Sequence, residues 1–118
     1  MIDRTAPDCI FCKIVRREIT ANEITRTDDA VVFADLDPKA PTHLLVIPAR
    51  HAANLGDFVA VAPRQEVGDL FALASAAGRA ASPGGYRLVV NEGLDGGQTV
   101  FHLHVHVFAG RAMTWPPG

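Results

Sequence analysis

Residues 98–110 form the stretch "QTVFHLHVHVFAG", in which three of the chain's five histidines alternate with apolar residues. These three are His102, His104 and His106. Successive side chains of a β-strand point to opposite faces of a sheet. The alternation therefore predicts a strand with three imidazoles on one face. Leu103, Val105 and Val107 lie on the other face, which we expect to pack against the core.

Further elements are predicted outward from this strand by hydrophobic periodicity and by turn residues. They are a short helix at 9–18, two strands within 23–35 joined by a polar turn at 27–29, a strand at 42–48, a long helix from about 63 to 81, and a strand at 86–91. Strands and helices do not alternate regularly in this order. The sequence thus favours an α+β fold with an antiparallel sheet of about five strands, rather than a doubly wound parallel sheet.

The composition is that of one globular domain spanning residues 1–118. Hydrophobic residues make up 48% of the chain and charged residues 20%, with a formal net charge of −2. This balance gives no electrostatic basis for binding nucleic acid or a membrane surface. No apolar run approaches the roughly 18 residues of a membrane helix, and the first residues lack the apolar region of a signal peptide. We expect a cytoplasmic protein with neither kind of partner.

The histidine face permits two kinds of chemistry. Three imidazoles could hold a metal ion such as zinc, although three successive positions on one strand are stretched for a single ion. Alternatively, a neutral imidazole could attack an electrophile while its neighbours orient it and handle protons. Solvated histidines on an edge strand would need no function, but three in register on one face disfavour that interpretation.

The segment before the histidines, "NEGLDGGQTV" at residues 91–100, favours the nucleophile. Its three glycines, Gly93, Gly96 and Gly97, free the backbone to turn and to present N–H groups to an anion. Gln98 and Thr99 add neutral donors. A glycine-rich loop that leads into a histidine strand suits a reaction at a phosphoryl group.

"GQTVFHLHVHVF" matches the His-φ-His-φ-His-φ-φ signature, where φ is apolar, and the chain thereby resembles the histidine-triad (HIT) superfamily. "CIFCKIVRREI", "ADLDPKAPTHLLVIPARH" and the terminal "WPPG" resemble its Hint-like branch, the purine nucleoside phosphoramidases. The resemblance covers residues 9–51 and 86–118. It implies a HIT-like fold with one long and one short helix, paired into a homodimer through the long helix and the strand before the glycine loop.

The resemblance also implies an activity, a nucleotidyl hydrolase that cleaves the P–N bond of adenosine 5′-monophosphate conjugates. His104 would attack the α-phosphorus and form a nucleotidyl-histidine intermediate, with no cofactor needed for catalysis. His106, Thr99 and Asn91 would contact the phosphate and the leaving group. The nucleotide would be bound by these residues together with Asp35 at the ribose, Ile10, Phe11 and Leu36 at the base, and Gly97, Gln98 and Val100 at the phosphate. Trp115 would lie near the partner subunit's site and influence the choice of leaving group.

Cys9 and Cys12 form a single C-x-x-C motif. A structural disulfide is not expected in a chain without an export signal, while a redox pair and half of a zinc site both remain open. The resemblance implies a structural zinc site completed by His51 and His102. In that case His102 is a ligand and takes no part in acid–base chemistry. Without a metal, the cysteines are small buried residues.

Three other functions compete with the phosphoramidase. Hydrolysis of dinucleoside polyphosphates is disfavoured by the terminal "WPPG". A nucleotide-binding regulatory or scaffold protein could dispense with His104, so the intact histidine pattern, together with Asn91 and Thr99, argues against it. A zinc-dependent hydrolase would require its activity to follow added metal.

Overall fold

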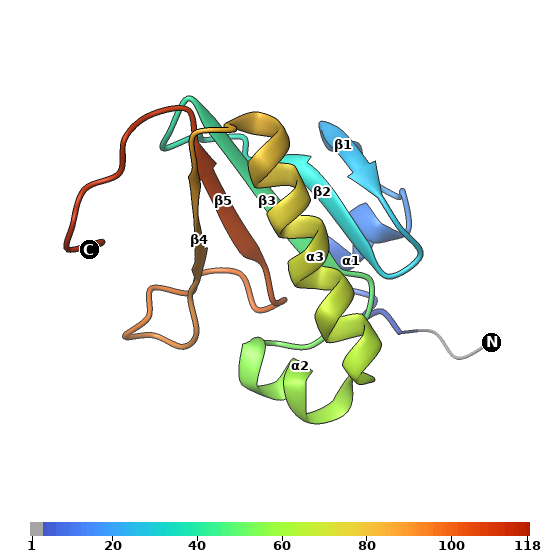
Figure 1. Cartoon of the computed structure of the whole chain (residues 1–118). Coiled ribbons are helices and arrows are strands. Elements are labelled where there is room, and N and C mark those ends of the chain that lie inside the picture. The colour runs from blue at the N-terminus through green and yellow to red at the C-terminus, as the bar shows by residue number, and fades with distance from the viewer. Residues whose placement is uncertain (1–3) are drawn as a thin grey trace.

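The computed structural model describes residues 4–118 and shows an α+β fold with one five-stranded antiparallel sheet (Figure 1). Its elements are α1 (Ile10–Val15), β1 (Glu23–Arg26), β2 (Ala30–Ala34), β3 (Thr42–Pro48), α2 (Leu55–Val61), α3 (Arg64–Ala81), β4 (Tyr86–Val90) and β5 (Val105–Ala109). The strand order is β1-β2-β3-β5-β4, so β3 and β5 are central and β4 is an edge strand. The α+β class and the antiparallel sheet are confirmed.

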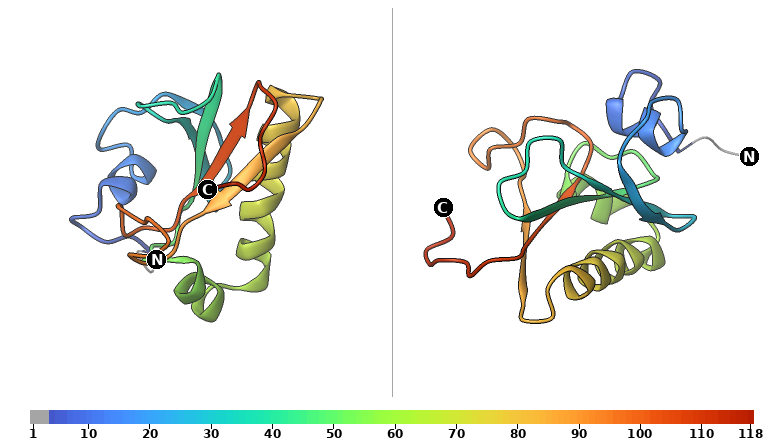
Figure 2. Two further views of the ribbon diagram at one scale, coloured as in Figure 1. Left: turned by 90° about the vertical axis from the view of Figure 1, so that its left-hand side faces the viewer. Right: turned by 90° about the horizontal axis from the view of Figure 1, so that it is seen from above.

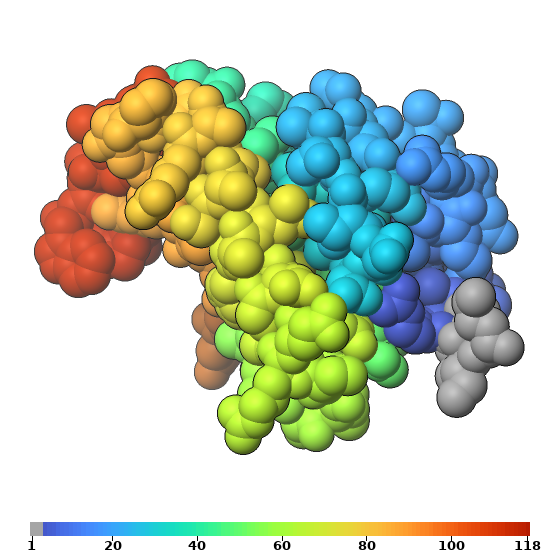
Figure 3. Space-filling view, turned by 45° about the vertical axis from the view of Figure 1, so that its right-hand side comes forward, coloured from blue at the N-terminus to red at the C-terminus, as the bar shows by residue number. Residues whose placement is uncertain are grey.

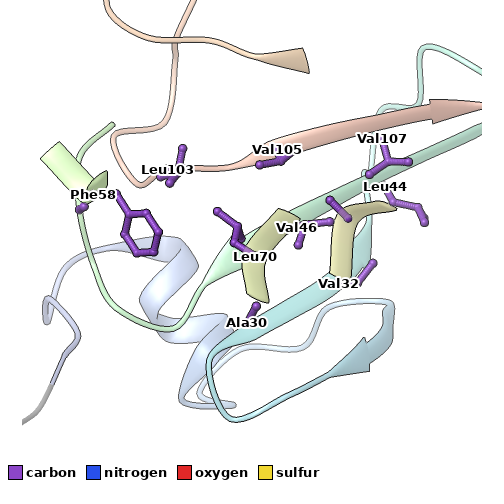
Figure 4. Packing of buried hydrophobic residues seen from close by; sticks show 11 residues of the cluster. Ala30, Val32, Leu44, Val46, Phe58, Leu70, Leu103, Val105 and Val107 are labelled. Atoms are coloured by element: carbon purple, nitrogen blue, oxygen red, sulfur yellow. The ribbon is translucent and has the colours of Figure 1, made fainter. Parts of the chain in front are cut away.

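Helix α3 covers one face of the sheet, and α1 lies on the opposite face (Figures 1 and 2). The apolar side chains of β2, β3 and β5 that point toward α3 form the main core with Leu70, Ala74 and Phe58 (Figure 4). Figure 3 shows α3 lying across the molecule between the β1–β2 hairpin and the C-terminal residues. None of the helices formed by residues 4–118 is both long and apolar enough to cross a membrane.

The second face of the sheet is only partly covered. Phe11 and Ile14 of α1 pack there on a smaller cluster that includes Phe33 of β2 and Leu45 of β3. Arg26 of β1 holds α1 in place, because its guanidinium donates hydrogen bonds to the carbonyls of the last helical residues. The rest of this face carries His43 of β3 and His106 of β5, and the site lies there.

The histidine segment is shorter as a strand than the alternation predicts. Strand β5 begins at Val105, so His102 and His104 precede it in irregular backbone. The N–H of Leu103 donates to the carbonyl of Ala52, which draws this part of the chain away from the sheet ladder. The predicted apolar face is confirmed, since Leu103, Val105 and Val107 are buried in the main core.

The helices differ from the prediction in number and extent. Helix α2 was not predicted, and the structure thus has two short helices beside the long one. Asn54 caps it through a hydrogen bond from the N–H of Asp57, but only Phe58 is buried, so its periodic signal is weak. Helix α1 is shorter than the predicted 9–18, because Arg17 adopts φ +61° and ends the helix.

Candidate active site and metal centre

A pocket of about 310 Å³ lies between α1, the end of β2 and the segment that carries the histidines. Most of its wall is apolar, and the expected base-pocket residues Ile10, Phe11 and Leu36 all line it. Sequence reasoning missed other apolar wall residues, namely Ile14, Ile19, Phe33 and Leu45. The polar wall is Asp35, Thr99, His104 and His106, together with Thr20 and Asn22. The pocket therefore joins an apolar chamber to a polar end that contains two histidines.

His104 is buried, and its protonation pattern is set by the backbone. Its Nδ1 lies 2.9 Å from the carbonyl oxygen of His102. A carbonyl can only accept a hydrogen bond, so Nδ1 carries the hydrogen and Nε2 of the neutral ring keeps its lone pair. The ring of Phe11 packs edge-on against it, with centroids 5.3 Å apart. His104 thus offers an oriented nitrogen nucleophile at the polar end of the pocket.

His106 is oriented by His43, a residue that sequence reasoning did not single out. The N–H of Lys39 donates to Nδ1 of His43 at 3.1 Å, so Nε2 carries the hydrogen of the neutral His43 ring. That Nε2 lies 2.9 Å from Nδ1 of His106 and donates to it. The hydrogen of neutral His106 is consequently on its own Nε2. His43 and Leu45 lie on the same face of β3, and only the pairing of Leu45 with His106 of β5 reveals that this is also the face of His106.

Both imidazoles in this pair stay neutral near pH 7. Burial, together with the neighbouring His104 and His43, lowers the pKa of His106 to about 4. Burial also lowers the pKa of His43, against the opposing effect of Asp35, whose carboxylate oxygen is 3.4 Å from Nε2 of His43. A neutral His106 with its hydrogen on Nε2 is a hydrogen-bond donor for an anionic or basic group in the pocket.

The glycine loop supplies fewer donors to the pocket than its sequence suggests. The N–H of Gly97 donates to Leu94, and the N–H of Gln98 donates to Gly93, both within the loop. The Gln98 side chain is buried and its amide is bonded to backbone groups, so it faces the protein. Thr99 and Val100 line the pocket, and in residues 4–118 their N–H groups have no partner. These two N–H groups are the available backbone donors.

A second, more polar recess lies on the other side of His106. Asn91, His43 and Asp35 line it together with Lys39 and Phe108, and its volume is about 440 Å³. Asp35 and His106 line both cavities, so the two hollows meet at these residues. Asn91 donates to the carbonyl of Gly96, which fixes its side chain beside the loop. Trp115 is 82% exposed on this chain and lies outside both hollows.

Cys9, Cys12, His51 and His102 come together in a separate cluster, as the resemblance implies. Their ligand atoms all lie within 4.8 Å of one another. Nδ1 of His102 is 3.3 Å from the sulfur of Cys9, 3.5 Å from that of Cys12 and 3.1 Å from Nδ1 of His51. The juxtaposition of C-x-x-C with two histidines, 39 and 90 residues beyond Cys12, is a closed Cys₂His₂ donor set.

The chemistry of this cluster fits a zinc ion. The other nitrogen of His102, Nε2, donates to the carbonyl of Pro48 at 2.9 Å, so Nδ1 is bare and directed at the cluster. A ligating histidine in proteins has this arrangement, with its second nitrogen donating to an acceptor. Burial lowers the pKa of His102 to about 4 and raises the pKa of the Cys12 thiol to about 11. A bound divalent cation would offset the cost of a buried thiolate.

The hydrogen-bond partner of the second ring nitrogen argues against a metal ion at the other group of potential ligands. Asp35, His43 and His106 also bring three ligand atoms within 4.8 Å of one another. Nδ1 of His43, however, faces the N–H of Lys39 and must remain an acceptor. If Nε2 bound a metal, the neutral ring would need its hydrogen on Nδ1, against that N–H. In this group His43 and His106 are joined by a hydrogen bond, and the Asp35 carboxylate lies 3.4 Å from Nε2 of His43.

The fold and site define an α+β protein with a histidine-centred pocket and a separate Cys₂His₂ cluster. The HIT domain model matches residues 16–113, and the chain belongs to the HIT family. It is 46% identical over 113 residues to an uncharacterized HIT-like protein of Synechococcus elongatus, a match covering 94% of this chain and 97% of that protein.

Solved structures agree with this assignment. A HIT family hydrolase from Legionella pneumophila superposes with a TM-score of 0.84 at 40% identity, over 94% of this chain and 100% of that one. A zinc-bound histidine triad family protein from Mycobacterium smegmatis superposes with a TM-score of 0.78 at 32% identity, over 88% of this chain and 76% of that one.

Proposed function

We propose that this protein is a Hint-like nucleotidyl hydrolase, which cleaves the P–N bond of adenosine 5′-monophosphate conjugates through a nucleotidyl-histidine intermediate. The observation that carries the proposal is the bond from Nδ1 of His104 to the carbonyl of His102, which leaves Nε2 as a nucleophile in the pocket. Family membership and the similarity to a HIT family hydrolase support hydrolytic chemistry.

In the first half-reaction, the Nε2 lone pair of His104 attacks the α-phosphorus and the P–N bond breaks. The leaving amine departs with a proton taken from solvent, while Nε2–H of His106, the tautomer that His43 fixes, donates a hydrogen bond to the reacting group. Positive charge develops on the His104 ring as the new P–N bond forms. The carbonyl of His102 accepts from Nδ1–H and stabilises that charge.

In the second half-reaction, water attacks the nucleotidyl phosphorus and the bond to His104 breaks. The attacking water releases its proton to solvent, and His104 departs as the neutral ring with its hydrogen still on Nδ1. The products are the nucleoside monophosphate and both histidines in their starting forms. One displacement is thereby divided into two steps, and each step uses the same pair of imidazoles.

The remaining pocket residues bind the nucleotide. The N–H groups of Thr99 and Val100, with the Thr99 hydroxyl, would donate to the phosphoryl oxygens. The Asp35 carboxylate lines the pocket and would accept from the ribose hydroxyls, while Ile10, Phe11 and Leu36 enclose the base. Gly97 and Gln98 would act by shaping the loop that presents Thr99.

The leaving group would occupy the polar recess that includes Asn91. We also propose a homodimer formed through β4 and α3, which would bring Trp115 near the partner's leaving-group recess. Strand β4 is an edge strand whose five residues are all half-buried, and such an edge can pair with a second copy. Light scattering coupled to size-exclusion chromatography tests the dimer.

Cys9, Cys12, His51 and His102 would hold a structural zinc ion. A zinc ion held by four protein ligands cross-links distant segments of the chain and has no coordination position left for a substrate or water. Here those segments are the start of α1, the end of β3 and the approach to β5. Nothing in the proposed reaction passes through the metal.

The test is to follow adenosine 5′-phosphoramidate and a diadenosine polyphosphate separately by chromatography, with rapid base quenching to preserve the P–N bond of the intermediate. We expect adenosine monophosphate from the phosphoramidate, and base-stable nucleotidyl-His104 located by peptide mass spectrometry. His104→Ala should bind adenosine monophosphate but release none from a conjugate. Faster cleavage of the polyphosphate would favour the dinucleoside hydrolase. Tight nucleotide binding with no turnover of either substrate would favour a regulatory or scaffold protein.

A further inference from the structure

The Cys₂His₂ cluster is connected to the pocket through the backbone of His102. None of Cys9, Cys12, His51 and His102 lines the 310 Å³ pocket. His102 nevertheless faces the cluster with its ring and the nucleophile with its carbonyl, which accepts from Nδ1 of His104 at 2.9 Å. The residue whose side chain would bind the metal thus sets which nitrogen of His104 is bare.

The sheet does not hold this carbonyl in place. Strand β5 begins at Val105, and within residues 99–104 the one backbone-to-backbone hydrogen bond outside the strands joins Leu103 to Ala52. The ring of His102 is fully buried and is anchored through Nε2 to Pro48 and through Nδ1 to the cluster. The direction of the His102 carbonyl therefore depends on what holds the ring.

Phe11 gives a second connection between the cluster and the pocket. It stands between the two cysteines in sequence, and its ring packs edge-on against both His102 and His104, at centroid distances of 5.8 and 5.3 Å. Phe11 also lines the pocket. Any displacement of Cys9 and Cys12 therefore moves a side chain that contacts the nucleophile directly.

We propose that the Cys9–Cys12–His51–His102 cluster, when it holds zinc, is a positioning element for His104. With the ring of His102 fixed, its carbonyl keeps the hydrogen of His104 on Nδ1 and the lone pair on Nε2. Without the ion, Nδ1 of His102 faces the like nitrogen of His51 at 3.1 Å and two thiols, a set with no unique hydrogen-bond pattern. The expected change in kcat rests on the proposed function, whereas the expected change in the tautomer of His104 does not.

The experiment uses the whole protein labelled with ¹⁵N-histidine, with zinc measured by mass spectrometry before and after removal by a chelator. Long-range ¹H–¹⁵N correlation spectra report which ring nitrogen of His104 is protonated, with the signal assigned from its loss in His104→Gln. We expect one tautomer, Nδ1–H, with zinc and a mixture without it. We expect kcat for adenosine 5′-phosphoramidate to fall roughly 10- to 100-fold and KM to change by less than about three-fold. Adding zinc should restore both readouts.

Two variants separate positioning from general stability. Cys12→Ser removes a soft ligand with little change in volume, so its spectra and kcat should match the stripped protein and should not recover with zinc. Ala74→Gly lowers stability from α3, on the other face of the sheet, and should reduce Tm without changing the His104 tautomer or kcat. A protein that is purified without zinc and is not stabilised by zinc would overturn the proposal.

An unchanged tautomer and kcat after zinc loss, with only Tm reduced, would equally overturn it. If neither metal state cleaves the phosphoramidate, the proposed function fails. The tautomer of His104 in the two states then decides the coupling independently.

Discussion

Replacing Gln98 by methionine tests how the glycine loop is held. Gln98 is 6% exposed, and its side-chain amide makes three hydrogen bonds to backbone groups. Its oxygen accepts from the N–H of Gly93 at 3.0 Å, and its nitrogen donates to Ala53 at 2.6 Å and to Val100 at 3.0 Å. The amide thus connects both ends of the loop to the segment before α2. Methionine keeps the length and the apolar stem but makes none of these bonds.

The expected decrease in the free energy of unfolding follows from the number of hydrogen bonds lost and from the burial of their partners. A typical intramolecular hydrogen bond contributes about 1 kcal/mol to stability, so loss of three would cost about 3 kcal/mol. Gly93, Ala53 and Val100 are only half-buried, so water can satisfy part of what is lost. We therefore expect Gln98→Met to lower the free energy of unfolding by about 2 kcal/mol.

Urea unfolding followed by far-ultraviolet circular dichroism measures this change, because the exposed Trp115 is a poor fluorescence probe. Gln65→Met is the matched control. Gln65 is exposed on α3 and makes a single bond to Asp69, so its loss should cost within about 0.5 kcal/mol. If the two variants are equally stable, the three bonds of Gln98 do not hold the loop and our account of it is wrong.

Three further changes probe other contacts. His43→Phe removes the donor that sets the tautomer of His106, and kcat for the phosphoramidate should fall roughly 10- to 100-fold with KM little changed; an unaltered kcat would exclude the role of His43. Gly78→Ala places a Cβ 2.5 Å from the Tyr86 ring and should cost about 1 to 3 kcal/mol in urea unfolding, whereas no loss would show that the ring yields freely. Because the folded pKa of His106 is about 4 and the unfolded value is 6.5, the unfolded chain binds more protons between these values and stability falls as pH drops through this window. His106→Gln should therefore reduce the loss of stability between pH 7 and pH 5 by about 1 kcal/mol relative to the parent protein, and an equal loss in both would contradict the shifted pKa.

The regular elements that bury alternate or helical apolar faces were predictable from the sequence. Strand β3 has the predicted bounds at 42–48, because prolines lie at both of its ends and apolar residues fill its interior. Helix α3 begins within a residue or two of the prediction, since Leu70, Ala74 and Gly78 repeat along one face toward the sheet. These patterns are local, so a single sequence displays them.

The features that were missed depend on contacts between distant segments. His43 is 63 residues from His106, and nothing near it in sequence indicates an orienting role. The irregular backbone at His102 and His104 results from the bond to Ala52 and from burial of the His102 ring, and both of these override the alternation that predicts a strand. In the same way, the Gln98 amide looks like a ligand donor until its backbone partners are known.

The three histidines of the run differ in what their second ring nitrogen meets, and this difference assigns their chemistry. In His102, Nε2 donates to Pro48, so Nδ1 is bare toward the cysteines. In His104, Nδ1 donates to the carbonyl of His102, so Nε2 is bare toward the pocket. In His106, Nδ1 accepts from His43, so Nε2 carries a hydrogen. In the function that we propose, identical side chains at alternate positions would thereby serve as a metal ligand, a nucleophile and a hydrogen-bond donor. It follows that substitutions which change the hydrogen-bond partner of a ring nitrogen, such as His43→Phe, should alter these functions although the three histidines themselves are unchanged.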